Sequence, residues 1–276
     1  MKKRFRKYLA LLSVLGLTVF LAACSNTPVT SKSTGLWDHW IVYNFSRVII
    51  WLSHHFGGYG MGIIIFTIIV RIIILPLMIY QTRSMRKTQE IQPKMKELQK
   101  KYSSKDMDTV RKLQDEQKKL YSEAGVNPFA SMLPLIVQLP IIYALYAAIW
   151  RTDALKHGSF LWLELGDKDP YFILPILAAI FTFMSSWLSM ASMPEKNGMT
   201  TTMTYVMPIF IFFMAMNMSS AISLYWSVTN AFQVGQTLVI QNPFKINRER
   251  AEKVAAEKAK KKAIEKAKRK AVKGRK

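Results

Sequence analysis

The sequence predicts an all-α polytopic membrane protein, with five transmembrane helices arranged around a hydrophilic, positively charged cavity. Half of the 276 residues are hydrophobic, yet the formal net charge is +22, because apolar and basic residues occupy separate blocks of the chain. Several apolar blocks are about as long as a helix that spans a bilayer. One of them, residues 60–80, carries Arg71 near its centre. A charge at the bilayer centre costs about 2.5–3.5 kcal/mol on insertion scales, so Arg71 should face water or an anionic group.

Residues 1–23 predict a lipoprotein signal peptide. A basic start is followed by an apolar run and by small residues before Cys24. The sequence Leu21-Ala-Ala-Cys24 resembles a bacterial lipobox, in which the cysteine is lipidated and becomes the new N-terminus. The alternative is that residues 8–23 remain as an uncleaved anchor. Cys24 is the sole cysteine, which rules out internal disulfides and a cysteine metal cluster. We therefore expect Cys24 to carry the lipid anchor.

Residues 24–58 predict an extracytoplasmic segment that contains an interfacial helix. Within residues 36–56, Trp37, Ile41, Phe45 and Val48 recur on one helical face. An amphipathic, tryptophan-rich helix of this kind lies in the membrane interface rather than across it. The adjacent histidines that follow point to different helix faces, which favours solvation over metal binding.

The membrane spans are expected at residues 59–82, 129–150, 171–190, 203–217 and 219–241. The last two come from one apolar stretch that is too long for a single span and is broken by small and polar residues at 217–220. Five spans after a cleaved signal place the mature N-terminus outside and the C-terminal tail inside. The loop charges agree, because residues 83–128 hold 12 basic and 7 acidic residues, whereas the extracytoplasmic loop 151–170 holds 3 and 4. Residues 191–202 form the remaining cytoplasmic loop.

Residues 83–128 predict a helical hairpin that projects into the cytosol. Apolar side chains recur there at three- and four-residue spacing in two runs, interrupted near Lys105. The first run is Ile91, Met95, Leu98 and Tyr102, and the second is Val110, Leu113, Gln117 and Leu120. A purely structural hairpin and a docking site for partner proteins both fit this pattern.

The C-terminal tail, residues 242–276, holds 15 Lys and Arg against 4 Asp and Glu. A segment of this composition cannot bury a core of its own. It could be a solvated tail that fixes the topology and contacts anionic lipids. It could also bind a polyanion such as ribosomal RNA in a salt-dependent manner.

The sequence lacks the residue patterns of the common enzyme classes. All four histidines fall outside the expected spans, and no Asp or Glu lies within one. There is no P-loop, HExxH or glycine-rich nucleotide motif. We therefore expect a protein that is not an enzyme and that uses no metal or other cofactor.

Polar side chains accompany Arg71 in the expected spans. Thr67 lies one helical turn before Arg71, Gln138 is central in the second span, and Ser227 and Asn230 share a face of the last. Any one of them could simply form an interhelical hydrogen bond. Together with an arginine that has no carboxylate in the spans, they predict a shared hydrated groove.

Several linked motifs resemble one known family. They are Arg71 with Leu75-Pro76, residues 92–102 (QPKMKELQKKY), Asn127-Pro128 with Gln138, and Leu224-Tyr-Trp226 with Asn230. Over residues 36–242 the chain resembles the YidC/Oxa/Alb family of membrane protein insertases, in particular its Gram-positive, lipoprotein-type YidC members.

The resemblance implies a five-span core whose groove is open to the cytoplasm and to lipid and closed on the outside. It implies an insertase and chaperone of the bacterial plasma membrane that acts as a monomer, alone or with the Sec translocon, on nascent membrane proteins delivered by ribosomes. Arg71 would receive the polar tail of a substrate while Thr67, Gln138, Ser227 and Asn230 keep the groove wet. Trp226 would either contact the sliding apolar segment or pack between helices.

Two alternatives remain at this stage. A small-solute or anion transporter could use Arg71 as its binding site, although the internal repeats typical of transporters are not evident in this sequence. A lipid-anchored scaffold that recruits ribosomes would leave the cost of Arg71 unexplained.

Overall fold

The computed structural model describes residues 27–104, 106–127, 133–194 and 198–273, with the side chains of 133–135 and 267–273 excepted. The expected signal peptide, Cys24 and the start of the expected second span lie outside the described residues.

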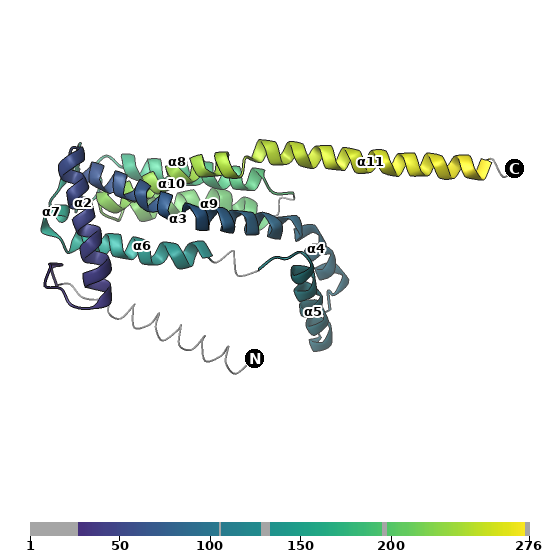
Figure 1. The fold of residues 1–276 in the computed structure, drawn as a ribbon, viewed down its shortest axis with the longest axis horizontal. Helices are drawn as coiled ribbons and strands as arrows, with labels where there is room; N and C mark the ends of the chain where they lie inside the picture. The colour runs from purple at the N-terminus through teal and green to yellow at the C-terminus, as the bar shows by residue number, and fades with distance from the viewer. Residues whose placement is uncertain (1–26, 105, 128–132, 195–197, 274–276) are drawn as a thin grey trace.

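The described chain is almost wholly helical (Figure 1). Its helices are the π-helical segment η1 (Leu36–Val42), α2 (Tyr43–Phe56), α3 (Tyr59–Glu90), α4 (Gln92–Lys101), α5 (Met107–Glu123), α6 (Leu133–Trp150), α7 (Asp153–Lys156), α8 (Ile173–Ala191), α9 (Gly198–Ala215), α10 (Ser220–Ile240) and α11 (Pro243–Lys273). The strands β1 (Ser159–Phe160) and β2 (Leu163–Glu164) form a short antiparallel ribbon in which Phe160 pairs with Leu163.

Three of these helices, α3, α8 and α9, are long and apolar enough to cross a membrane, and α6 contributes a shorter apolar stretch, Ile136–Trp150. The structure therefore supports three candidate spans together with shorter apolar helices. Helix α10 has the length of a span, but its composition is more polar because it includes Asn230, Gln233 and Gln236. A crossing by α6 and by α10 remains a prediction from the sequence.

The expected cytoplasmic segment 83–128 begins inside a longer helix than the sequence pattern indicated. Helix α3 continues past the expected end of the first span to Glu90, with Pro76 inside it, and α4 and α5 follow as separate helices. Asp106 is the N-cap of α5 and accepts a hydrogen bond from the backbone N–H of Thr109 at 2.8 Å. The Ser104 hydroxyl and that N–H stabilise the carboxylate and hold the pKa of Asp106 well below its usual range.

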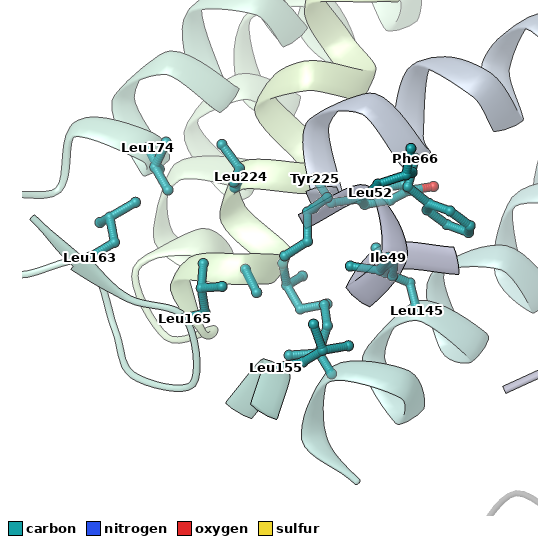
Figure 2. Close-up of a cluster of buried hydrophobic side chains, with 14 residues drawn as sticks. Ile49, Leu52, Phe66, Leu145, Leu155, Leu163, Leu165, Leu174, Leu224 and Tyr225 are labelled. Atoms are coloured by element: carbon teal, nitrogen blue, oxygen red, sulfur yellow. The ribbon is translucent and has the colours of Figure 1, made fainter. Parts of the chain in front are cut away.

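The main hydrophobic core lies at the end of the bundle formed by α2, α7, the end of α6 and the starts of α3, α8 and α10. Figure 2 shows side chains from these elements pointing toward one another. The chain between α6 and α8 folds into this core, because it contributes the buried side chains of Leu155, Leu163 and Leu165. Its backbone also binds the first turn of α10, where the N–H of Ser220 donates to the carbonyl of Asp167 at 2.6 Å. The loop expected at 151–170 is therefore an integral part of the packed core.

Candidate functional site

Arg71 lies on α3 with only 7% of its surface exposed. Its guanidinium Nη2 donates a long hydrogen bond, 3.4 Å, to the side-chain oxygen Oε1 of Gln138 on α6. The structure thus brings together two residues that the sequence had placed in one groove from different spans.

Gln138 also binds a third helix. Its Nε2 donates to the hydroxyl of Tyr225 on α10 at 2.6 Å, so that a hydrogen-bonded chain runs from α3 through α6 to α10. Sequence reasoning did not select Tyr225 as a site residue. The sequence offered one general signal, since a tyrosine hydroxyl within a buried helix normally needs a hydrogen-bond partner.

The hydroxyls of Thr67 and Ser227 are bonded to backbone carbonyls. Thr67 is buried one turn before Arg71, and its Oγ1 donates to the carbonyl of Ile63 at 2.7 Å. Ser227 donates to the carbonyl of Leu174 at 3.0 Å and to that of Ser223 at 2.9 Å. Ser227 therefore joins α10 to the start of α8, which is the interhelical role that any single serine can have.

The other two expected groove residues are half-buried. The Asn230 amide donates to the carbonyl of Trp226 at 2.9 Å within α10, and its side-chain oxygen is left to accept a further bond. Trp226 packs against the hydrophobic core of Figure 2. This is what its expected role in packing between helices requires. Residues Arg71, Gln138 and Tyr225 thus form the connected polar centre, with Asn230 about one turn of α10 beyond it.

The polar character continues along α3 and α10 toward α4 and α11. Gln81 on α3 and Gln236 on α10 are both buried, and the side-chain oxygen of each has no hydrogen-bond partner among the described residues. A buried amide oxygen without a partner costs about 1–3 kcal/mol unless water or a ligand binds it. The second halves of α3 and α10 therefore each bury a polar group that the described residues do not satisfy.

The charge of Arg71 is not neutralised by the protein within the part of the chain that the structure describes. The ion pairs found there involve other residues, such as Arg151 with Asp38 and Arg86 with Glu90. A guanidinium has five N–H donors, and Gln138 occupies one of them at a long distance. The remaining donors can bind water, a peptide carbonyl or a carboxylate. The described residues also include no group of three or more His, Cys, Asp or Glu placed to hold a metal ion.

Comparisons with known proteins identify the family of the chain. Residues 51–249 match the model of the family described as 60Kd inner membrane protein. The chain is 66% identical over 252 residues to "Membrane protein insertase YidC 2" of Lactiplantibacillus plantarum, covering 91% of each chain. It is 54% identical over 250 residues to "Membrane protein insertase YidC" of Enterococcus faecalis, covering 91% of this chain and 90% of that one.

A solved structure has a similar fold. It is titled "Active YidC insertase crystal structure with the first transmembrane domain resolved", and it superposes with a TM-score of 0.58 at 27% sequence identity. The match covers 73% of this chain and 46% of that longer chain.

Proposed function

The chain belongs to the 60Kd inner membrane protein family and is a membrane protein insertase of the YidC type, and from this premise we propose that Arg71 receives the polar tail of each substrate. As an insertase it is a multi-pass bacterial membrane protein whose substrates are nascent membrane proteins. The proposal concerns how its residues perform the insertion.

The observation that carries the proposal is a buried guanidinium that has no carboxylate partner among the described residues. Arg71 is held between α3, α6 and α10, and its long bond to Gln138 leaves most of its donors available. An acidic substrate tail that enters the groove pairs with Arg71 and gives up its hydration at lower cost than in lipid. The membrane potential then favours outward movement of the negative charge by about 2.3 kcal/mol per charge and 100 mV.

The packed core supports a groove that is closed on the outside. The loop carrying Leu155, Leu163 and Leu165 covers the ends of α3 and α10 beyond Arg71, whereas the contact between these helices stays polar in the other direction, at Gln81 and Gln236. We infer that α6 and α10 also cross the membrane, that Cys24 anchors the N-terminus outside, and that the tail is cytoplasmic. A single chain supplies the whole polar centre, which supports function as a monomer.

Replacement of Arg71 tests the receiver role. In a strain depleted of its own insertase, Arg71→Ala should abolish insertion of a single-span protein with an acidic N-terminal tail, because the charge that pairs with the tail is lost. Arg71→Lys should restore most of the insertion, since it keeps a positive charge at the same depth. Protease accessibility of the substrate tail measures the inserted fraction.

The substrate provides the matched control. Neutralising the acidic residues of its tail should reduce the difference in inserted fraction between the native protein and the Arg71→Ala variant. Thr88→Val, farther along α3 and similar in size, removes a hydroxyl already bonded to a backbone carbonyl and should insert the acidic substrate normally. Equal insertion of the acidic substrate by the Arg71→Ala protein would rule out the receiver role.

We further propose that α11 contacts the ribosome, while the groove acts alone or beside the Sec translocon. The first turns of α11 are docked, because Asn247 donates to the carbonyl of Ala191 at 2.8 Å and Arg250 to that of Ser192 at 3.0 Å. Residues 251–266 are exposed, and the helix extends away from the bundle (Figure 1). The lysine-rich part therefore presents its charge to a large anionic partner rather than to the protein.

Truncation after Arg250 separates the two parts of the tail. It keeps the docked turns and removes the exposed lysines, so co-sedimentation with ribosomes should weaken, and the remaining binding should lose much of its salt dependence. Insertion of small substrates should persist. Ribosome binding that survives the truncation at every salt concentration would refute a role for the exposed part of α11.

A further inference from the structure

The segment that follows the expected lipidation site is packed onto the outer end of α6. Val29 and Val42 are buried against Ala147 and Ala148 of α6. The rings of Trp37 and Tyr143 also lie in contact, with 5.9 Å between their centroids. Residues 27–42, which we call the N-terminal strap, therefore form a small core with α6 that is separate from the core of Figure 2.

A buried ion pair fixes this contact. Arg151, directly after α6, donates from Nη1 to Oδ1 of Asp38 at 2.9 Å and from Nη2 to Oδ2 at 2.6 Å. Its Nε donates to the carbonyl of Thr27 at 2.7 Å, and its own carbonyl accepts from the N–H of Val29 at 3.0 Å. The side chains of Arg151 and Asp38 are only 4% and 15% exposed. A two-pronged pair of this kind fixes both the distance and the orientation of the two groups.

The first half of α6 is held less firmly than the second, in which Leu145 and Ile149 are also buried in the core of Figure 2. The helix packs mainly against η1, α2 and α7, all near its outer end, and touches α3 and α10 at few places. Gln138, which binds both Arg71 and Tyr225, is one of those places. Gln138 and Arg151 are 13 residues apart, which corresponds to about 20 Å along a helix. A tilt of about 5° at the outer end would then move Gln138 by roughly 1.7 Å, enough to break both of its hydrogen bonds.

We propose that Arg151 and Asp38 are positioning residues for insertion, which set the tilt of α6 and thereby hold Gln138 against Arg71. The inference rests on the proposed role of the Arg71 groove, but the position of α6 can be measured independently of insertion.

Pulsed electron paramagnetic resonance on the full-length protein tests the positioning. Spin labels at Leu139→Cys on α6 and Ile73→Cys on α3 would occupy exposed positions, 53% and 70% exposed in the native protein. We expect a narrow distance distribution that broadens in Asp38→Asn and, less strongly, in Arg151→Lys, which keeps the charge but loses the two-pronged geometry. The exchanged pair Asp38→Arg with Arg151→Asp should narrow the distribution again.

Insertion of the acidic-tailed substrate should decrease in the variants whose distance distribution between the two spin labels broadens. We expect it to fall about tenfold in Asp38→Asn, as displaced groups in a site commonly cause, and to recover in the exchanged pair. Asp115→Asn is the matched control, because it breaks an exposed pair with Lys118 on α5 and should change neither measurement. Thermal unfolding of each variant checks that it is folded.

The outcomes separate the two proposals. An unchanged distance distribution in Asp38→Asn would overturn the positioning role, whatever happens to insertion. A broadened distribution that the exchanged pair restores supports the positioning role. If Arg71→Ala also inserts normally, that result refutes the receiver role and leaves the positioning of α6 supported.

Discussion

Replacing Gly62 by alanine should separate α2 from α3, and the structure gives the size of the effect. A Cβ at Gly62 would lie 2.2 Å from Oγ of Ser53, 2.7 Å from the carbonyl oxygen of Ile49 and 3.0 Å from the backbone nitrogen of Ser53. The serine hydroxyl can rotate away, but the other two atoms belong to the backbone of α2. The whole helix must therefore shift by several tenths of an ångström, and overpacking of this kind costs about 1–3 kcal/mol.

Gly235 on α10 provides the opposite case. An alanine Cβ there would meet nothing within 4 Å, and alanine is favoured over glycine inside a helix by about 1 kcal/mol. The same substitution should therefore destabilise the protein at Gly62 and leave it unchanged or more stable at Gly235.

Thermal unfolding in detergent measures the difference. Because Gly62 also lies inside a helix, alanine brings the same gain of about 1 kcal/mol there, and the net cost is up to about 2 kcal/mol. With about 2–4 °C per kcal/mol for chains of this size, Gly62→Ala should lower Tm by up to about 8 °C. Adding Ser53→Ala should recover little, because the contacts with the backbone of α2 remain. A Tm for Gly62→Ala at or above that of Gly235→Ala would refute the close packing of α2 on α3.

Two further predictions concern hydrogen bonds. Gln138→Leu and Tyr225→Phe should each lower the free energy of unfolding in detergent by about 0.6 kcal/mol, the average for interhelical hydrogen bonds in membranes. Because the two side chains share one hydrogen bond, the double variant should lose clearly less free energy of unfolding than the sum of the two single variants. Strictly additive losses would argue against the bond. Asp106→Ala should speed hydrogen exchange in the first turn of α5 at pH 7, because a helix cap is lost. Since the pKa of Asp106 is lowered by folding, its stabilising effect is complete above the usual carboxylate pKa and is lost only as the pH falls through the lowered value. The protection of that turn from hydrogen exchange in the native protein, corrected for the intrinsic exchange rate, should thus be the same at pH 7 and pH 5. A loss of protection at pH 5 would contradict the lowered pKa of Asp106.

The family and the insertase function were predicted from linked motifs in the sequence, and the comparisons confirm both. The positions of the helices were also largely available, because hydropathy and turn residues are local properties. The expected spans at 171–190 and 219–241 correspond to α8 and α10 within two residues at either end. The first span was expected to end at residue 82, but the chain turns polar there without a helix-ending signal, so the helix α3 continues to Glu90.

The hydrogen-bond partners of the site residues could not be predicted from local sequence in the same way. Ser227 and Arg71 both looked like groove residues, but only the packing of α8 against α10 shows that the Ser227 hydroxyl is bonded to the carbonyl of Leu174. Tyr225 was not predicted for a related reason, because its role in the site depends on a hydrogen bond from Gln138, which is 87 positions away in the chain.

By itself, the sequence determined that this is a helical membrane protein with a costly arginine inside an apolar helix, since composition and spacing along the chain decide where helices and charges lie. Only the tertiary structure decided that α6 bridges Arg71 to Tyr225, that the loop after α6 closes one end of the bundle, and that Arg151 holds a strap 113 residues away. These contacts depend on how whole helices tilt and pack against one another. That geometry is set by the sum of many weak contacts and leaves no local mark in the sequence.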